Sequence, residues 1–447
     1  MTGLAWTLAR AGGWPRMLLV TTCTAVVSGL LMVAVALLLL PSQPDELLFN
    51  LVADPGVRGG TAFGTVLMTL PALMLLNQAV RLGTAARERR LAALRLAGAT
   101  PGPVRLLGTF EVGAPSLVGG VLGLAVYAFL RATLGGIPHD APAERFVRMS
   151  TRSVRLVPTT VTPQWWQFLL VVLAVTLAGI AVGALASRGL VISPLGVSRR
   201  QRTTPPRPWG LLALAAAAGT GAVAVALHAD STLVGMAAVA LAVGGIISLA
   251  PWAAYRAGRR AQRRASSAPA LLAAGRLVAD PRPAGRAAAA VGAIALVSGG
   301  SAAITADTLG DPYADSFYLV SMLIVAMVLV AALAVAAWTL AVHTVESLLD
   351  RRRSTAALVA LGATTADLER SQRSECALVA LPLSVAGVAV GTLALGPFVG
   401  ASGSGVLLML ANLVVTPGLV WVAIAAAVRL VRPWTVRAGA PGNLRTE

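Results

Sequence analysis

Long apolar stretches separated by short polar segments make up most of this chain. Ten of them are close to the ~20 residues that an α-helix needs to cross the ~30 Å hydrocarbon core of a bilayer. The pattern therefore predicts an all-α polytopic membrane protein with ten transmembrane helices. The predicted spans are 17–40, 61–80, 108–131, 165–187, 209–228, 231–251, 286–306, 317–342, 375–397 and 406–428.

The arginines between the spans give the predicted bundle an orientation. With the N-terminus in the cytoplasm, the segments on that side carry 30 of the 36 basic residues, all of which are Arg. This bias follows the positive-inside rule. We expect a multi-pass protein of a bacterial plasma membrane with both termini cytoplasmic.

One external segment, 132–164, is long, carries four arginines of its own and ends at Trp165 and Trp166. Aromatic residues often anchor a chain at the membrane interface, so a surface cap is one interpretation. The other is an external gate, or a contact for anionic lipid headgroups or a partner protein.

Composition excludes several kinds of chemistry. Only 12% of the residues are charged, against about 25% in soluble domains, so lipid must replace most of the solvent. Without lysine the chain has no P-loop ATPase site. The two Cys and three His lack disulfide or metal-ligand spacing, and nucleic acid is not an expected partner. We expect no enzyme activity and no catalytic, cofactor-binding or metal-binding residue.

The sequence contains an internal repeat. Segments 87–100 and 351–364 match at an offset of 264 positions, including a basic run, an Ala-Leu stretch and a Gly-Ala-Thr triplet. Glu111/Glu375 and Gly123/Gly387 keep the same offset. Before the first helix of each repeat, at an offset of 266, Arg10, Pro15 and Arg16 match Arg276, Pro281 and Arg282.

The repeat predicts the domain organisation. An even number of helices separates equivalent points, so the two repeats are parallel and related by an axis along the membrane normal. We expect a 4+2+4 layout in which two four-helix units form a pseudo-dimer. The predicted domains are a first unit at 1–187, a two-helix insert at 188–264, a second unit at 265–435 and a cytoplasmic tail at 436–447.

The repeated segment itself predicts a short amphipathic helix at the membrane face. Gly98 and Gly362 stand where a helix C-cap belongs, and Thr100 and Thr364 can N-cap the next helix. A single copy could be an ordinary interfacial helix with snorkelling arginines. Two copies at matched positions favour docking onto a two-fold symmetric soluble partner.

These residues resemble the permease domain of FtsX-like, or MacB-like, ABC transporters. The ten-helix layout is similar to Bce-type permeases, but lacks their large external domain. The resemblance implies a cytosolic ATPase homodimer that binds ATP and Mg, while this chain binds no cofactor. It assigns the coupling helices that dock this ATPase to about 87–104 and 351–368. The implied docking residues are Arg87, Arg89, Arg90, Leu91, Leu94, Gly98, Thr100, Arg351, Arg353, Leu358, Gly362 and Thr364.

The resemblance also marks Glu111 and Glu375 as candidates for transmitting movement. Each is either a carboxylate favoured near a helix N-terminus by the macrodipole, or the partner of a coupling-helix arginine in a salt bridge. The sequence leaves both interpretations open.

Three functions are compatible with this layout. The first is ATP-driven export or extraction of a hydrophobic or amphipathic substrate, such as a lipid, lipopeptide or antibiotic. The second is mechanotransmission to an external hydrolase or sensor kinase without transport. The third, ion-coupled transport, is disfavoured because it needs carboxylates within the spans, which the sequence lacks at mid-span.

Overall fold

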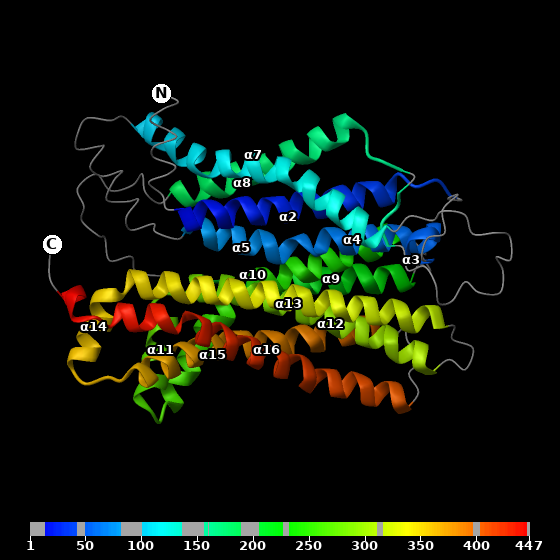
Figure 1. Cartoon of the computed structure of the whole chain (residues 1–447). Helices are drawn as coiled ribbons and strands as arrows, with labels where there is room; N and C mark the ends of the chain where they lie inside the picture. Colours follow the sequence, from blue (N-terminus) through cyan, green and yellow to red (C-terminus); the bar gives the residue numbers. More distant parts are fainter. Residues whose placement is uncertain are drawn as a thin grey trace. The chain divides into compact units, whose positions relative to one another are not determined.

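A computed structural model describes residues 14–42, 50–81, 101–135, 156–159, 161–188, 205–226, 232–310, 316–396 and 403–444. Every regular element in these ranges is a helix, as predicted. The chain divides into two compact units, Met1–Arg200 and Gln201–Glu447 (Figure 1). Each unit is described by itself below.

Within the described ranges, nine helices are long and apolar enough to cross a membrane, one fewer than the ten predicted. The predicted span 209–228 differs, because within its helix, Trp209–Ala226, the apolar stretch Trp209–Val223 is shorter than the candidate spans. The other helices run past their apolar stretches at one or both ends, since hydropathy detects only the part that lies in hydrocarbon. The 4+2+4 arrangement remains a prediction.

The first unit is built around its first helix, α2, which contacts α4, α5, α7 and α8. The predicted span 61–80 is one of the nine candidate crossings, Val57–Val80, and a turn at Met68 divides it into α4 and α5. Pro71 explains the break, since its ring lacks an N–H and clashes with the carbonyl of the residue four positions earlier, Leu67. The helices are α2 (Trp14–Leu38), α3 (Asn50–Ala53), α4 (Pro55–Leu67), α5 (Thr69–Arg81), α7 (Pro101–Leu134) and α8 (Trp165–Arg188).

The second unit is built around α12, whose apolar window is 78% buried. This helix contacts α10, α13, α15 and α16. The elements are α9 (Trp209–Ala226), α10 (Thr232–Arg264), α11 (Ala268–Ala279), α12 (Pro281–Gly310), α13 (Ser316–Asp350), α14 (Arg352–Ala360), α15 (Thr365–Leu395), α16 (Gly403–Ala438) and the short 3-10 helix η3 (Pro441–Leu444).

The two units pack equivalent helices in the same pairs. Helix α2 contacts α5, α7 and α8 in the first unit, as α12 contacts α13, α15 and α16 in the second. The fourth helix of each unit also contacts the second and third, namely α8 with α5 and α7, and α16 with α13 and α15. The sequence repeat is therefore also a repeat of packing. The pseudo-dimer stays a prediction.

Glycines bring the first and third helices of each unit into close contact. A Cβ atom added at Gly119 of α7 would lie 2.4 Å from the carbonyl oxygen of Thr21 in α2. One added at Gly391 of α15 would lie 2.0 Å from the carbonyl oxygen of Leu296 in α12. The repeated Gly123 and Gly387 belong to the same two contacts. Small residues allow this approach, which gives membrane helices their packing energy.

Segment 132–164 is described in part, and its residues 136–155 and 160 lie outside the described ranges. The backbone N–H of Leu156 donates to the Leu134 carbonyl at 3.0 Å, and Arg131 donates to the Thr159 carbonyl. Val157 is buried in the core of the first unit. This end of the segment is thus packed on the end of α7.

We expect Gly391→Ala to destabilise the second unit by at least about 2 kcal/mol, because the added methyl group must push two helix backbones apart. Gly396, at the end of the same helix, has open space around its Cβ position and provides the control Gly396→Ala. Thermal unfolding of both variants in detergent checks this. Equal stability of the two variants would contradict the close helix contact.

Candidate functional site

The candidate docking segment of the second repeat is a helix–turn–helix with both ends of its turn capped. Gly362 has a φ of +98°, in the left-handed region that favours glycine. The Ala363 N–H donates to the Leu358 carbonyl at 3.0 Å, and the Gly362 N–H to the Val359 carbonyl at 2.9 Å. These two bonds form a Schellman motif. Gly362 thus follows the C-cap residue Leu361 as the left-handed residue that ends α14, which confirms the predicted helix stop at this glycine.

The helix after the turn has the predicted N-cap. The Thr364 hydroxyl accepts from the Asp367 N–H at 3.2 Å, and the Thr364 N–H donates to the Asp367 carboxylate at 3.1 Å. This capping box satisfies two backbone donors at the start of α15. The turn is therefore fixed on both sides.

One apolar side chain stands out at the turn. Leu361 is 84% exposed, the largest exposed fraction among the large apolar side chains described. Arg352 and Arg353 on α14 are also exposed, whereas Leu358 is half-buried. The opposite face of α14 is anchored by Thr355 and Ala356, which are both buried.

The anchored face of α14 rests on the C-terminal part of the unit. Helix α14 contacts α13, α16 and η3. A Cβ added at Gly439, directly after α16, would lie 3.1 Å from Val359 Cγ2. We call segment 351–368 with its exposed Leu361 the knob.

A buried ion pair lies beneath the knob. Arg276 of α11 and Glu375 of α15 approach to 3.6 Å, and their side chains are 12% and 9% exposed. Burial lowers the pKa of Arg276, and the Glu375 carboxylate opposes this shift. A buried pair of this kind depends on both partners, since loss of one leaves an uncompensated charge.

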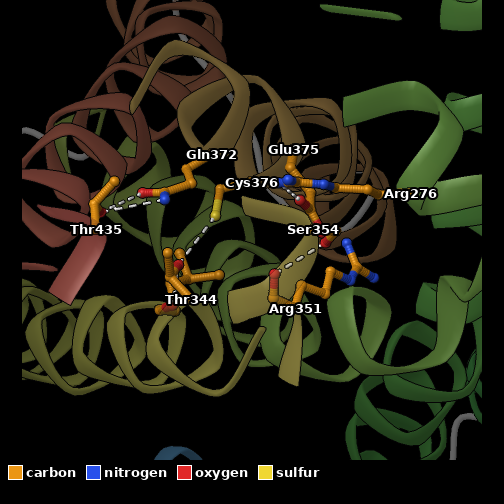
Figure 2. A network of polar contacts seen from close by, with 9 residues as sticks. Arg276, Thr344, Arg351, Ser354, Gln372, Glu375, Cys376 and Thr435 are labelled. Atoms are coloured by element: carbon orange, nitrogen blue, oxygen red, sulfur yellow. Dashed lines mark hydrogen bonds and ion pairs between the residues drawn. The ribbon is translucent and has the colours of Figure 1, made fainter. Parts of the chain in front are cut away.

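The ion pair borders a small cavity of about 10 Å³, lined mostly by residues with polar side chains and roughly the size of one water molecule. Arg351, the N-cap of α14, lines this cavity together with the pair. His343 and Thr344 of α13 line it too, and Thr344 contacts Cys376 at 3.8 Å. Figure 2 shows Arg276 of α11, Thr344 of α13, Arg351 at the start of α14, and Glu375 and Cys376 of α15 in one region. The base of the knob and the ion pair therefore share one cluster.

A second interhelical contact extends the cluster to α16. Gln372 Nε2 donates to the Thr435 hydroxyl at 3.3 Å, and both residues are buried (Figure 2). The first turns of α15 are thus tied to α11 on one side and to α16 on the other.

The first unit has a similar ion pair at the corresponding place. Arg16 of α2 pairs with Glu111 of α7, with side chains 8% and 15% exposed. In the sequence alignment Arg16 matches Arg282, which is exposed, whereas the partner of Glu375 is Arg276, the match of Arg10. Non-equivalent arginines therefore neutralise equivalent glutamates. Arg10 lies outside the described residues.

The predicted docking residues of the first repeat, Arg87, Arg89, Arg90, Leu91, Leu94, Gly98 and Thr100, lie outside the described residues. In the second repeat, Arg353 is exposed on the knob, while Arg351 is half-buried at its base. Both docking surfaces remain predictions.

Sequence analysis did not name Leu361, and it identified Arg16 and Arg276 as repeat positions without assigning them as ion-pair partners. Leu361, rather than Leu358, is the exposed apolar residue, because the turn at Gly362 carries it off the packed face of α14. For Glu111 and Glu375, the described ion-pair partners are Arg16 and Arg276, which lie outside the two coupling segments. The repeat could have suggested them, since arginines precede or begin the first helix of both repeats.

Among the described residues no group of His, Cys, Asp or Glu could hold a metal ion. Residues 62–195 match the family model of the FtsX-like permease C-terminal domain. No curated protein and no solved structure matches the chain. The resemblance to FtsX-like permeases is thus confirmed from a segment that includes α5, α7 and α8.

We expect Glu375→Gln to lower the free energy of unfolding of the second unit by about 3 kcal/mol, because it leaves the Arg276 charge buried without a carboxylate. The double variant R276Q/E375Q should recover part of this loss, since it removes both charges. Unfolding of the purified protein in mixed micelles measures both values.

The matched control is Glu369→Gln on the same helix. Glu369 pairs with Arg432 at 3.2 Å, but Arg432 is 69% exposed. An exposed pair of this kind contributes at most about 1 kcal/mol. If Glu369→Gln lowers the free energy of unfolding as much as Glu375→Gln does, the buried pair contributes no more to stability than an exposed pair.

Proposed function

From the premise that residues 62–195 are an FtsX-like permease domain, we propose that this chain is the membrane-spanning subunit of an ABC transporter. A separate cytosolic ATPase homodimer hydrolyses ATP with Mg and docks on the knob and on the equivalent segment of the first repeat, about 87–104. FtsX-like permeases generally pair with such an ATPase.

The exposed, capped turn of the knob is the observation that carries this proposal. Leu361 offers an apolar anchor after the C-terminal end of α14, and Arg352 and Arg353 at the N-terminal end of the same helix can contact acidic groups. Anchors of this kind, in a surface that needs little reordering, contribute most to a protein interface. The Schellman motif and the capping box supply that rigidity.

The buried cluster gives a route by which movement of the knob reaches the membrane helices. Arg351 joins the base of α14 to the cavity that Arg276 and Glu375 border. Glu375 lies on α15, which packs closely against the central helix α12. Nucleotide binding shifts the permease only if the closed ATPase dimer fits one conformation better than the other.

The proposed cargo is hydrophobic or amphipathic, such as a lipid, lipopeptide or antibiotic, moved outward or out of the outer leaflet. Ion pathways through membranes require ionisable side chains facing the bundle interior. Glu111 and Glu375, the paired carboxylates of the two units, lie about three turns into α7 and α15 and are already neutralised by arginines. This favours a substrate that crosses without a proton or ion relay.

We expect Leu361→Asp to lower the affinity of the purified permease for its ATPase by about tenfold or more, because it puts a charge at the apolar anchor. Co-purification and titration of the ATPase onto nanodisc-embedded permease measure this. ATP hydrolysis by the complex should lose its dependence on the permease.

The control is Leu271→Asp on α11, where an equally large apolar side chain is 54% exposed outside the knob. Docking should be unchanged in this variant. Unimpaired docking of Leu361→Asp would refute the knob as the ATPase contact. Coupled ATP hydrolysis without any movement of a labelled lipid would instead favour mechanotransmission.

A further inference from the structure

Helix α10 is longer than a membrane crossing requires. Its 33 residues, Thr232–Arg264, span about 50 Å at 1.5 Å per residue. The hydrocarbon core is ~30 Å thick and takes up about 20 residues. The residues from Trp252 to Arg264 therefore extend beyond the apolar part as a continuous helix.

This extension carries an arginine stripe, which we define as Arg256, Arg259, Arg260, Arg263 and Arg264. Their spacing of i, i+3, i+4, i+7 and i+8 places all five on one face of the helix. All five are exposed. The opposite face packs on α11, because Ala254 is fully buried and a Cβ added at Gly258 would lie 2.9 Å from Leu277 Cβ.

The stripe lacks internal charge compensation. The sequence contains no Asp or Glu between Asp230 and Asp280. None of the ion pairs found in the described ranges involves these five arginines. Like charges at helical spacing repel one another. A dense row of them is thus suited to an external anionic partner.

The arginines lean towards the membrane part of α10. Helical side chains point back towards the helix N-terminus, and here the apolar span lies on that side. The Arg256 guanidinium lies over the Trp252 ring at 5.3 Å, and that of Arg259 over the Tyr255 ring at 5.9 Å. Trp and Tyr mark the headgroup level of membranes. The first arginines of the stripe are therefore held at the depth of lipid phosphates.

We propose that the arginine stripe of α10 is a binding site for the headgroups of anionic phospholipids. Arg256, Arg259 and Arg260 lie within about 6–12 Å of Trp252 along the axis, at 1.5 Å per residue, and contact the phosphates directly. Arg263 and Arg264 lie further out and act through longer-range attraction, which salt screens beyond ~8 Å.

The test uses the full-length protein in detergent with dioleoyl-phosphatidylglycerol or dioleoyl-phosphatidylcholine as the probe. Native mass spectrometry measures the apparent Kd for each lipid. We expect wild-type protein to prefer phosphatidylglycerol, and R256Q/R259Q/R260Q to weaken this binding roughly 100-fold, at about 1 kcal/mol for each arginine. R256K/R259K/R260K should keep most of the affinity because it keeps the charge.

The matched control, R429Q/R432Q/R437Q, removes the same charge from exposed arginines of α16 and should retain phosphatidylglycerol. An equal loss in this control would overturn the proposal in favour of a bulk charge effect. Equal retention of both lipids by wild-type protein would overturn it in favour of an acidic protein partner. If free glycerol phosphate displaces bound phosphatidylglycerol when both are present at the same concentration, the stripe would be a site for soluble phosphates instead.

Discussion

The rest of each unit depends on the close packing of its first helix against its third. A buried arginine–glutamate pair lies at one end of this contact. Glycines bring α2 to α7 and α12 to α15 within backbone contact. Earlier in each third helix, Glu111 or Glu375 would be a costly buried charge without Arg16 or Arg276. The fourth helix then packs on this pair of helices in both units.

That constraint also positions the knob. Because α15 is held by α11 through Glu375 and by α16 through Gln372, its capped start at Thr364 has a defined place. The turn at Gly362 and the short α14 directly precede this start in the chain. Arg351, the N-cap of α14, lines the same cavity as Glu375 and Gln372. A displacement of α14 therefore bears on groups that also hold α11 and α15. In the proposed function, this connection is what couples a docked ATPase to the membrane helices.

Local features of this structure were predictable from the sequence, and contacts between distant segments were not. Gly362 and Thr364 were assigned correctly as caps because cap chemistry depends on a few neighbouring residues. Apolar length located the spans but not their ends. Helix α10 continues to Arg264 rather than stopping at 251, since an amphipathic, arginine-rich helix carries no hydropathy signal. Which arginine pairs with Glu111 or Glu375 depends on how the helices pack. The repeat marked these glutamates and arginines as matching positions, but it did not show which of them form pairs.

The sidedness of the knob is the most direct test of its role, because an ATPase-docking surface must face the cytoplasm. The two native cysteines, Cys23 and Cys376, are buried, so a single Leu361→Cys variant offers one exposed thiol for a membrane-impermeant maleimide. We predict that the maleimide labels this thiol in inside-out vesicles but not in intact cells. Binding of the ATPase should prevent the labelling. Labelling of Leu361→Cys in intact cells would place the knob outside and contradict ATPase docking there.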